Sequence, residues 1–405
     1  MTASTAYTLP AVKAPHRGAW EDRHLGSARA LQDCVETLLD RSNLAVIHGG
    51  DKTVDGAVIN QTGNPRSWKS YKSVAEDIAG ALRRLGCPKV CVMPDDMQLG
   101  RRLAEENIHM AWLNTGGVQG YSPLCHAASM LEMMGLPYVG HDPMTAGILD
   151  RKDVFKRFLM ALGFPTAPFI TWNMAEGPFD PASNDRFWQV LGDHAGAFVV
   201  KPVSGRASLN VHWVESRSGL QAAVAPVYEA TRSLVMIEPY LPGREYCVAV
   251  SGYVTAQRRE LKRHRDPFVV CAIERILQPD ERIVTSMDVR PITGDRLRVL
   301  DPEQDAAVLQ QLEALARNVY REMNIESLIR FDVRTDESGR LQVLEANPKP
   351  DLKAPSRAQT SLVAASLSAY GMSYDDLILS LFADRIDFLF GERPGCVGQL
   401  KALLD

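Results

Sequence analysis

The runs Ser327-Leu328-Ile329-Arg330-Phe331-Asp332-Val333 and Leu344-Glu345-Ala346-Asn347-Pro348 decide the fold of this 405-residue chain. Both runs are largely apolar, and residues 335–340 between them read Thr-Asp-Glu-Ser-Gly-Arg. Two strand-like runs on either side of such a turn-forming segment predict a β-hairpin. The hairpin supplies two neighbouring strands, and the strand repeat determines which face each polar side chain occupies.

The polar side chains of this hairpin should gather on one face. Arg330 and Asp332 share a face because side chains alternate along a strand. Glu345 and Asn347 also share a face, with Leu344 and Ala346 opposite. If the two polar faces are in register, two carboxylates and a carboxamide meet, which destabilises a sheet. A divalent cation would turn that cost into a binding site, since hard cations prefer oxygen ligands.

A solvated outer face is the alternative interpretation of the same residues. Two observations favour a site over it. The polar set contains no Lys and no Thr, which are the usual residues of an exposed strand. It also carries Arg330 beside the carboxylates, where a negatively charged group could be held. The hairpin alone leaves both interpretations open.

The composition is that of a globular protein of two to three domains, with 45% hydrophobic and 23% charged residues. A net charge of -4 gives no reason to expect nucleic acid or an anionic membrane as a partner. No apolar run approaches the ~18 residues of a membrane span. Residues 1–20 do not resemble a secretory signal. The seven scattered cysteines indicate reduced thiols in a cytoplasmic protein, and the nine histidines show no zinc-ligand spacing.

The N-terminal third alternates strands and helices. Residues 1–42 form a polar extension with one helical stretch near 28–39. Apolar runs at 44–48, 90–93 and 109–113 predict strands, and helical spacing predicts a helix over 73–85. Strand, helix, strand order implies a small doubly wound parallel sheet.

After a helix predicted over Asp150 to Leu162, strands dominate the chain. They are expected at 197–201, 211–214, 234–238 and 246–250, with helices near 220–231 and 304–323. This pattern is typical of an α+β region with antiparallel sheets. The tail after Phe390 should be a loop and a short last helix.

Lys201 ends the apolar strand Phe198-Val199-Val200 and precedes a loop of small residues, 203–208. An unpaired buried charge is costly, so the ammonium group needs a partner. Backbone N–H groups of such a loop suit an anion, and together they predict a phosphate site. A lysine that reaches solvent is the alternative. No Walker loop is present.

Glu238 ends another apolar strand, 234–237, and Glu245 begins the next one. A carboxylate at a strand end followed by apolar residues could read the edge of an adenine. Glu245 could accept hydrogen bonds from ribose hydroxyls. An ordinary hairpin connection with exposed acids is the alternative for this segment alone.

Taken together, these motifs resemble the ATP-grasp superfamily, and within it the D-alanine–D-alanine ligase-like branch. The resemblance covers about residues 130–380, beginning with the Met130–Gly140 stretch at the end of the first domain. It implies an α/β and α+β protein with the ATP-grasp fold and an N-terminal doubly wound parallel-sheet domain. The expected parts are an extension (1–42), the parallel-sheet domain (43–145), a small ATP-grasp subdomain with a lid loop (146–240), a catalytic subdomain with the metal hairpin (241–390) and a tail (391–405).

The resemblance also implies roles for individual residues. ATP would be held by phosphate lysines, the lid, the adenine hinge and the ribose glutamate: Lys152 (followed on its helix by Lys156), Lys201, Ser208, Glu238, Tyr240, Leu241 and Glu245. Two Mg²⁺ ions, with Mn²⁺ as an alternative, would bind Asp332, Glu345 and Asn347. Arg330 would stabilise the tetrahedral intermediate, and Ser361 would hold the acceptor's carboxylate.

The departures from the family pattern fall in the expected substrate pockets. The family's glutamate after Gly49-Gly50 is absent, since Asp51–Asp55 follows. The segment after Asn347 reads Pro348-Lys349-Pro350-Asp351 in place of the family's glycine. Asp351 and Lys353 are therefore the candidate substrate-reading residues, with Arg357 in the same loop. Pairing of these charges with one another is the alternative.

The resemblance implies an ATP-dependent carboxylate–amine ligase that acts through an acyl phosphate and releases ADP and phosphate. Its partners would be a small carboxylate and a small amine, and a homodimer is left open. The departures indicate specialised metabolism and not cell-wall synthesis. Two other functions remain: another ATP-grasp reaction such as carboxylation of bicarbonate, and a nucleotide-binding protein without activity.

Overall fold

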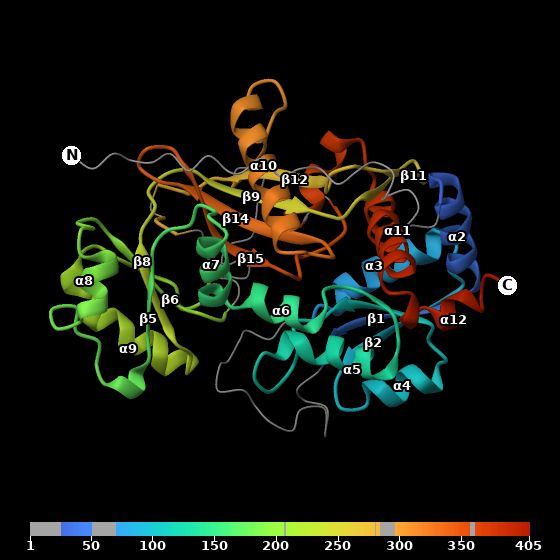
Figure 1. Ribbon diagram of the computed structural model, residues 1–405, viewed down its shortest axis with the longest axis horizontal. Helices are drawn as coiled ribbons and strands as arrows, with labels where there is room; N and C mark the ends of the chain where they lie inside the picture. The colour runs from blue at the N-terminus through green and yellow to red at the C-terminus, as the bar shows by residue number, and fades with distance from the viewer. Residues whose placement is uncertain (1–25, 51–69, 206–207, 280, 284–295, 357–360) are drawn as a thin grey trace.

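The computed structural model describes residues 26–50, 70–205, 208–279, 281–283, 296–356 and 361–405. Within these ranges the chain forms a parallel sheet, two antiparallel sheets and a separate two-stranded hairpin (Figure 1). The parallel sheet and the four-stranded antiparallel sheet lie at opposite ends of the molecule, and the five-stranded sheet lies between them.

The N-terminal domain is a parallel sheet in the order β2-β1-β3-β4, which confirms the predicted doubly wound sheet. It follows helix α2, which begins after the N-cap Ser27. Its elements are α2 (Ala28–Arg41), β1 (Asn43–Gly49), α3 (Lys72–Arg84), β2 (Lys89–Asp95), α4 (Leu99–Glu105), β3 (Met110–Asn114), α5 (His126–Met134) and β4 (Tyr138–Val139).

Strand β1 is almost continuously buried because helices cover both faces of the sheet. Leu44 and Val46 belong to the hydrophobic core that includes α3. Ala45 and Ile47 point the other way, into the core that includes α4 and α5. The alternation of side chains along one strand thus supplies two separate cores.

The four-stranded antiparallel sheet has the order β5-β8-β6-β7 and forms the small subdomain at the left of Figure 1. Phe187, Phe198, Val224 and Ile237 lie in its core, between the sheet and helices α8 and α9. Its elements are β5 (Ile170–Trp172), α8 (Asp185–Leu191), β6 (Phe198–Pro202), β7 (His212–Val214), α9 (Leu220–Thr231) and β8 (Val235–Pro239).

The five-stranded antiparallel sheet has the order β13-β12-β9-β14-β15, and its last two strands are the predicted hairpin. Tyr246, Val248, Phe331 and Val343 lie on the face that packs against α10 and α7. Its elements are β9 (Glu245–Val250), β12 (Val269–Arg275), β13 (Leu297–Val299), α10 (Ala306–Glu322), β14 (Ile329–Thr335) and β15 (Leu341–Asn347).

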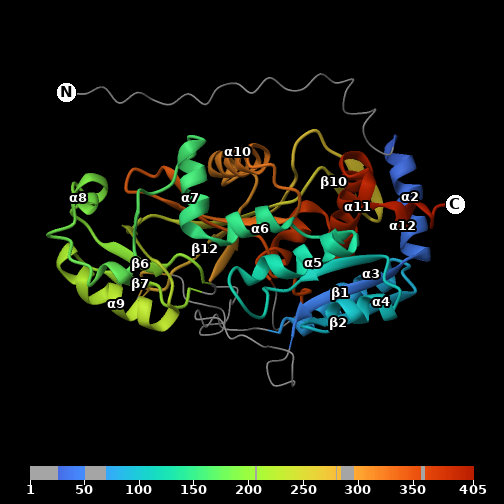
Figure 2. The same ribbon diagram turned by 60° about the horizontal axis from the view of Figure 1, so that its bottom comes forward.

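Two helices connect the parallel-sheet domain to the antiparallel sheets: α6 (Pro143–Asp150) and α7 (Lys152–Ala161) (Figure 2). The helix predicted from Asp150 is wrong at its start, because Arg151 is extended with ψ 104° and separates α6 from α7. Lys152 therefore lies at the first position of α7, and its backbone N–H donates to Val203 O at 2.9 Å. Phe155 of α7 stacks on Phe331 of β14.

Helix α11 (Tyr374–Glu392) joins the two ends of the chain, and 13 of its 19 residues are buried. It packs against α2 and α3 on one side and against the hairpin of β10 (Val254–Gln257) and β11 (Glu260–Arg263) on the other. Ser373 and Asp376 form a capping box at its start. The tail ends in the short helix α12 (Gly398–Lys401), as predicted.

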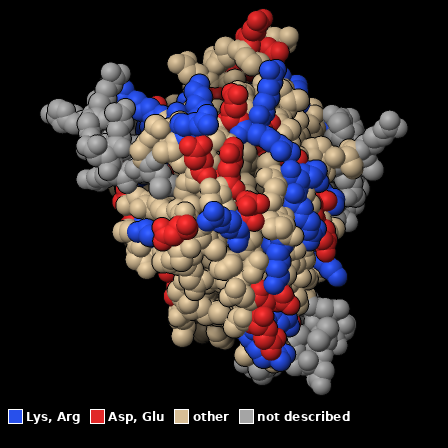
Figure 3. Space-filling view, turned by 90° about the vertical axis from the view of Figure 1, so that its right-hand side faces the viewer, with Lys and Arg blue, Asp and Glu red and all other residues tan. Residues whose placement is uncertain are grey.

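Acidic and basic side chains lie close together on the side of the molecule that carries α2, α11 and α12 (Figure 3). Two ion pairs there involve α11: Arg84 with Asp375 at 2.6 Å and Arg263 with Asp387 at 2.5 Å. Among the residues that the structure describes, every helix is too short or too polar to cross a membrane.

Asp384 of α11 provides a test of this packing through its pKa. Its Oδ1 accepts hydrogen bonds from Tyr253 N at 2.6 Å and Val254 N at 3.1 Å. Burial raises the pKa of Asp384 to about 7, although these two hydrogen bonds lower it. In the unfolded chain an aspartate carboxyl ionises near pH 3.9. Ionised Asp384 therefore lowers the free energy of unfolding, and this penalty is absent below about pH 3.9 and complete above about pH 7.

We expect Asp384→Asn to be more stable than the wild type at pH 8 and to lose this advantage near pH 4. The difference should grow by at most about 1.4 kcal/mol per pH unit between the two pKa values. Urea unfolding from pH 4 to pH 8 measures it, and Glu392→Gln, exposed on the same helix, is the control. A difference that does not change with pH would contradict the assignment.

Candidate active site

The β14–β15 hairpin brings the predicted polar residues into register. Asp332 lies directly opposite Glu345, and Arg330 lies opposite Asn347. The register shifts by one residue after this pair, because Leu344 is an extra residue on β15. Leu341, Val343 and Ala346 point into the core. The sequence placed Leu344 on the face opposite Glu345, and this is wrong: the bulge puts both side chains in the same cavity.

That cavity lies between the small subdomain and the hairpin. It contains nine of the residues assigned a role from the sequence: Lys152, Lys201, Ser208, Glu238, Tyr240, Leu241, Glu245, Asp332 and Glu345. Apolar residues also line it, among them Val199, Val211, Pro239, Ile283 and Leu344. A flat apolar ring and a charged chain could therefore occupy the cavity together.

Glu238 is held between two buried lysines. Its Oε1 lies 2.5 Å from Lys201 Nζ, and its Oε2 accepts a hydrogen bond from Lys156 Nζ. Burial would raise the pKa of Glu238, but the charges of Lys156 and Lys201 outweigh it and hold that pKa at about 2. Both carboxylate oxygens are engaged in the structure, so Glu238 acts first as a counterion of the lysines.

Lys152 connects the start of α7 to the hairpin. Its Nζ lies 3.1 Å from Glu345 Oε2 and donates to Gly205 O at 3.0 Å. Gly205 and Ser208 both line the cavity, while residues 206 and 207 of the predicted lid lie outside the described residues. The ammonium group of Lys152 thus lies where the loop meets the polar face of the hairpin.

Asp332 is surrounded by cationic and polar groups. Arg330 donates to both of its oxygens, at 2.7 and 3.0 Å, and Arg275 lies 3.5 Å away. Cys247 Sγ donates to Asp332 Oδ1 at 3.4 Å. Burial raises the pKa of Asp332, but the charges of Arg330 and Arg275 and the hydrogen bonds from Arg330 and Cys247 together outweigh burial and hold that pKa below its usual value. Asp332 is therefore ionised at neutral pH.

Two charged residues that line the cavity were not predicted from the sequence: Arg275 and Arg334. Arg275 lies 3.1 Å and Arg334 lies 3.5 Å from Glu245. Arg334 also donates to the Tyr240 hydroxyl at 2.8 Å and stacks over its ring. The sequence position of each arginine could have predicted it. Arg275 is the last residue of β12, two residues after the apolar run Val269–Ile273, and Arg334 follows the alternation of Arg330 and Asp332.

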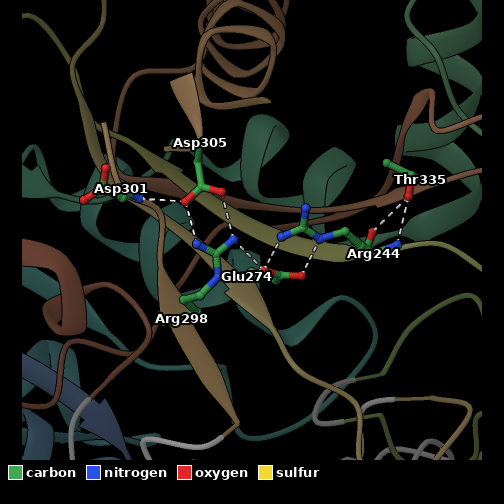
Figure 4. Close-up of polar contacts among 6 residues, drawn as sticks. All are labelled: Arg244, Glu274, Arg298, Asp301, Asp305 and Thr335. Carbon is green, nitrogen blue, oxygen red and sulfur yellow. Dashed lines mark hydrogen bonds and ion pairs between the residues drawn. The ribbon is translucent and has the colours of Figure 1, made fainter. Parts of the chain in front are cut away.

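A second polar network holds the same strand ends from behind (Figure 4). Arg244 and Arg298 both bind the carboxylate of Glu274, and Arg298 also binds Asp305 at the start of α10. Arg244 N donates to Thr335 Oγ1 at 2.8 Å. Arg244, Glu274 and Thr335 each adjoin a cavity residue in the sequence. Because neighbours on a strand face opposite ways, this network fixes the positions of the residues in front.

The residues present fit a magnesium ion. Asp332, Glu345 and Asn347 offer oxygen atoms, and Mg²⁺ is commonly bound by one or two carboxylates together with phosphates. Asn347 Nδ2 is buried and has no hydrogen-bond partner among the described residues, so the amide retains freedom to orient. Within the described residues no cluster of three or more His, Cys, Asp or Glu side chains could hold a metal. Phosphate oxygens would have to complete such a site.

The remaining predicted residues lie outside the lining of this cavity. Arg330 and Asn347 are on the same hairpin, next to it. Ser361 is fully buried, and its Oγ accepts from Ala364 N at 3.0 Å. Its predicted contact with a substrate carboxylate remains a prediction.

The predicted substrate loop contacts the parallel-sheet domain. Lys353 Nζ lies 2.8 Å from Asp77 of α3, so its ion pair joins this loop to the parallel-sheet domain. Asp351 instead caps the backbone N–H of Lys353 at 3.2 Å. Lys349 donates to Asn114 at the end of β3 and lies 3.4 Å from the centre of the Tyr71 ring. Residues 51–55 and Arg357 lie outside the described residues.

Comparisons with known proteins agree with this geometry. The family model described as "D-ala D-ala ligase C-terminus" matches residues 158–383. A D-alanine--D-alanine ligase of Gloeobacter violaceus is 28% identical over 310 residues, 76% of this chain and 92% of its own. The uncharacterized protein y4sG of Sinorhizobium fredii is 27% identical over 267 residues, 65% of this chain and 70% of its own.

Solved structures share the fold. The D-alanine--D-alanine ligase of Bacillus anthracis complexed with ATP superposes with a TM-score of 0.59 at 19% identity, covering 85% of this chain and 96% of that one. The VanG D-Ala:D-Ser ligase of Enterococcus faecalis gives a TM-score of 0.60 at 16% identity, covering 85% and 99%. The arrangement of the three larger sheets is therefore shared with enzymes of known activity.

The Lys152–Glu345 ion pair predicts how metal binding responds to a mutation. A metal ion that binds Glu345 must displace Lys152 from it, and the positive charge of Lys152 repels the metal ion. We expect Lys152→Met to tighten Mn²⁺ binding to the nucleotide-free protein by about three- to tenfold. Electron paramagnetic resonance of free Mn²⁺ measures this. Lys89→Met, which breaks the exposed pair with Glu106, is the control. Unchanged or weaker Mn²⁺ binding would show that the pair does not compete with the metal.

Proposed function

The chain belongs to the D-alanine–D-alanine ligase family of ATP-grasp enzymes, and we propose that it joins a small carboxylate to a small amine through an acyl phosphate. It is an ADP-forming ligase by family. The observation that carries the proposal is the convergence of Lys152, Lys201 and Glu245 on one cavity with the facing pair Asp332 and Glu345.

In the proposed complex ATP lies along this cavity. The adenine occupies the apolar end near Tyr240 and Leu241, where backbone groups after β8 read its edge. The ribose hydroxyls donate to Glu245, which Arg275 and Arg334 hold in place. The phosphates extend toward Lys201 and Lys152, whose ammonium groups neutralise them. Gly205 and Ser208, which line the cavity, would lie over the phosphates and help to exclude water.

Asp332, Glu345 and Asn347 would hold magnesium, which when bound neutralises the phosphate oxygens. In the first step a substrate carboxylate oxygen attacks the γ-phosphorus, and ADP leaves. The amine nitrogen then attacks the carbonyl carbon, and phosphate leaves with the bonding electron pair while the amine gives up a proton. A free carboxylate resists such attack because its leaving oxygen is strongly basic, and phosphorylation removes that obstacle. The protein's part is positioning and charge neutralisation.

Arg330 is the candidate for stabilising the charge that develops on the tetrahedral centre. Its guanidinium is held by two hydrogen bonds to Asp332, which fix its direction at the edge of the hairpin. It lies opposite Asn347 in the register and two residues before Asp332, which supports a position beside the proposed metal ligands. Ser361 would hold the carboxylate of the acceptor.

The substrates are proposed to differ from those of the cell-wall ligases. The residues that face ATP follow the family pattern, whereas residues 348–356 do not. Asp351, with a carboxylate four residues after Asn347, would repel an acceptor's carboxylate and attract an ammonium or guanidinium group. Lys353 would contribute only after leaving Asp77. We therefore propose a ligase of specialised metabolism.

The experiment that tests this function is a screen for ADP release. The purified protein is incubated with ATP, Mg²⁺ and pairs of amino acids or small acids with amines, and products are identified by mass. ADP release that requires both an acid and an amine supports the ligase. Release that requires bicarbonate would indicate carboxylation, and binding of ATP without turnover under any condition would favour a non-catalytic protein.

The metal site predicts the effect of one substitution. Asp332→Asn keeps the shape of the side chain but removes the charge, so we expect turnover to fall by about a thousandfold or more while the fold survives. Initial rates of ADP release and circular dichroism measure both. Glu337→Gln makes the same chemical change at an exposed position of the same hairpin and should leave the rate unchanged. Normal turnover in Asp332→Asn would refute the metal site.

The substrate proposal predicts little activity with D-alanine alone. In the presence of ATP and Mg²⁺, we expect D-alanyl-D-alanine to form much more slowly than the product of the best pair found in the screen. Chromatography of the dipeptide measures it, and a cell-wall D-alanine--D-alanine ligase serves as the positive control. Efficient synthesis of D-alanyl-D-alanine would show that the changes in residues 348–356 carry no specificity.

A further inference from the structure

Lys156 is a fully buried lysine that the proposed mechanism does not use. Its side chain is 0% exposed, and it is absent from the residues that line the cavity. It lies one helical turn after Lys152 on α7, so the two side chains leave the same face of the helix. Its ammonium group donates to Glu238 Oε2 and lies 5.3 Å from the centre of the Phe169 ring.

The other oxygen of the Glu238 carboxylate forms an ion pair with Lys201. Glu238 Oε1 lies 2.5 Å from Lys201 Nζ, and both side chains are buried. Strands β6 and β8 fix this pair, because Val199 lies opposite Glu238 and Lys201 lies two residues further along. The three groups therefore form a buried triad in which one carboxylate serves two ammonium groups.

The charges of this triad do not cancel. Two lysines and one glutamate sum to +1 when all three are ionised. Burial lowers the pKa of Lys156, and the charge of Glu238 opposes that shift only in part. The charges of the lysines hold the pKa of Glu238 at about 2 against burial, which raises it. Burial lowers the pKa of Lys201, but Glu238 and Glu345 have the larger combined effect and raise it. Without Lys156 the remaining pair of Glu238 and Lys201 would be neutral.

We propose that Lys156 is a positioning residue that occupies half of the Glu238 carboxylate and so leaves the charge of Lys201 available to the phosphates of ATP. Lys156 never contacts the nucleotide and acts only through Glu238. The inference rests on the proposed function, because it requires that the cavity binds ATP. It assigns the buried positive charge to phosphate binding and not to the stability of the fold.

A structural role is the competing explanation. Lys156 could simply connect α7 to β8, and its loss would then disturb the whole subdomain. The two explanations differ in which part of the nucleotide they affect. A change of charge near Lys201 acts on phosphates and leaves adenosine untouched. A disturbed subdomain affects the adenine end as well, since Tyr240 and Leu241 directly follow β8.

The test measures binding of ATP with Mg²⁺ and of adenosine to the full chain by calorimetry. We expect Lys156→Met to weaken ATP by about ten- to a hundredfold, the effect of one unit charge a few ångströms from the phosphates. Adenosine binding should remain unchanged. The double variant Lys156→Met with Glu238→Gln restores a charge of +1, so ATP affinity should return to near that of the wild type.

Three results would overturn the proposal: ATP binding by Lys156→Met equal to that of the wild type, equal losses for ATP and adenosine, or no recovery in the double variant. If Lys156→Met does not fold, Glu238→Gln is compared with the double variant, which leaves no buried carboxylate unpaired. The proposal expects tighter ATP binding by Glu238→Gln, and equal affinities overturn it. A wild type that does not bind ATP would refute the proposed function and this inference with it. Binding by the wild type without the expected response of Lys156→Met would refute only the inference.

Discussion

A charge removed from water must be compensated, and this constraint shapes the cavity between the small subdomain and the hairpin. Every cavity carboxylate has a cation within reach: Glu238 has two lysines, Glu345 has Lys152, Asp332 has Arg330, and Glu245 has two arginines. A magnesium nucleotide brings the opposite arrangement, with phosphates for the cations and metal for the carboxylates. The groups that pair with one another in the protein are thus the same groups that would hold ATP and magnesium: the cations would turn to the phosphates and the carboxylates to the metal. Binding would replace one set of compensated charges by another and leave no buried charge alone.

The five-stranded sheet makes this possible because it has two working faces. Along β9, β12 and β14, Glu245, Arg275 and Arg334 face the cavity, and their neighbours Arg244, Glu274 and Thr335 face the other way. The rear network fixes the backbone, and the fixed backbone positions the front side chains. The bulge at Leu344 also contributes, because it lets an apolar residue and the proposed metal ligand Glu345 occupy the same face in succession. A regular strand would have had to place one of them in the core.

Local signals explain which parts could be predicted from the sequence. A charged residue at the end of an apolar strand identified Lys201 and Glu238, and alternation identified Asp332, Glu345 and Asn347. Leu344 could not be placed correctly, since a bulge depends on the pairing of two strands and leaves no mark in one of them. Helix α11 was missed for a different reason: it is buried on nearly every side, charged residues such as Asp384 and Arg385 included, so it lacks the apolar repeat that marks a surface helix. The pairing of Lys353 with Asp77 joins residues 276 positions apart, and such contacts follow only from the completed fold.

Contacts between residues that are far apart in the sequence shape the proposed substrate end of the site. Lys349 meets Tyr71 and Asn114, Lys353 meets Asp77, and the hydroxyl of Tyr374 donates to Leu352 O at 2.8 Å. The segment after the β14–β15 hairpin therefore contacts the parallel-sheet domain and α11, whereas the proposed nucleotide cavity is lined by α7, by strands β6, β8, β9 and β12, by the loop after β6 and by the hairpin. A family built in this way can keep one phosphate chemistry while the docking of its first domain selects the carboxylate and the amine, and the residues that depart from the family pattern in this chain lie on that side of the division.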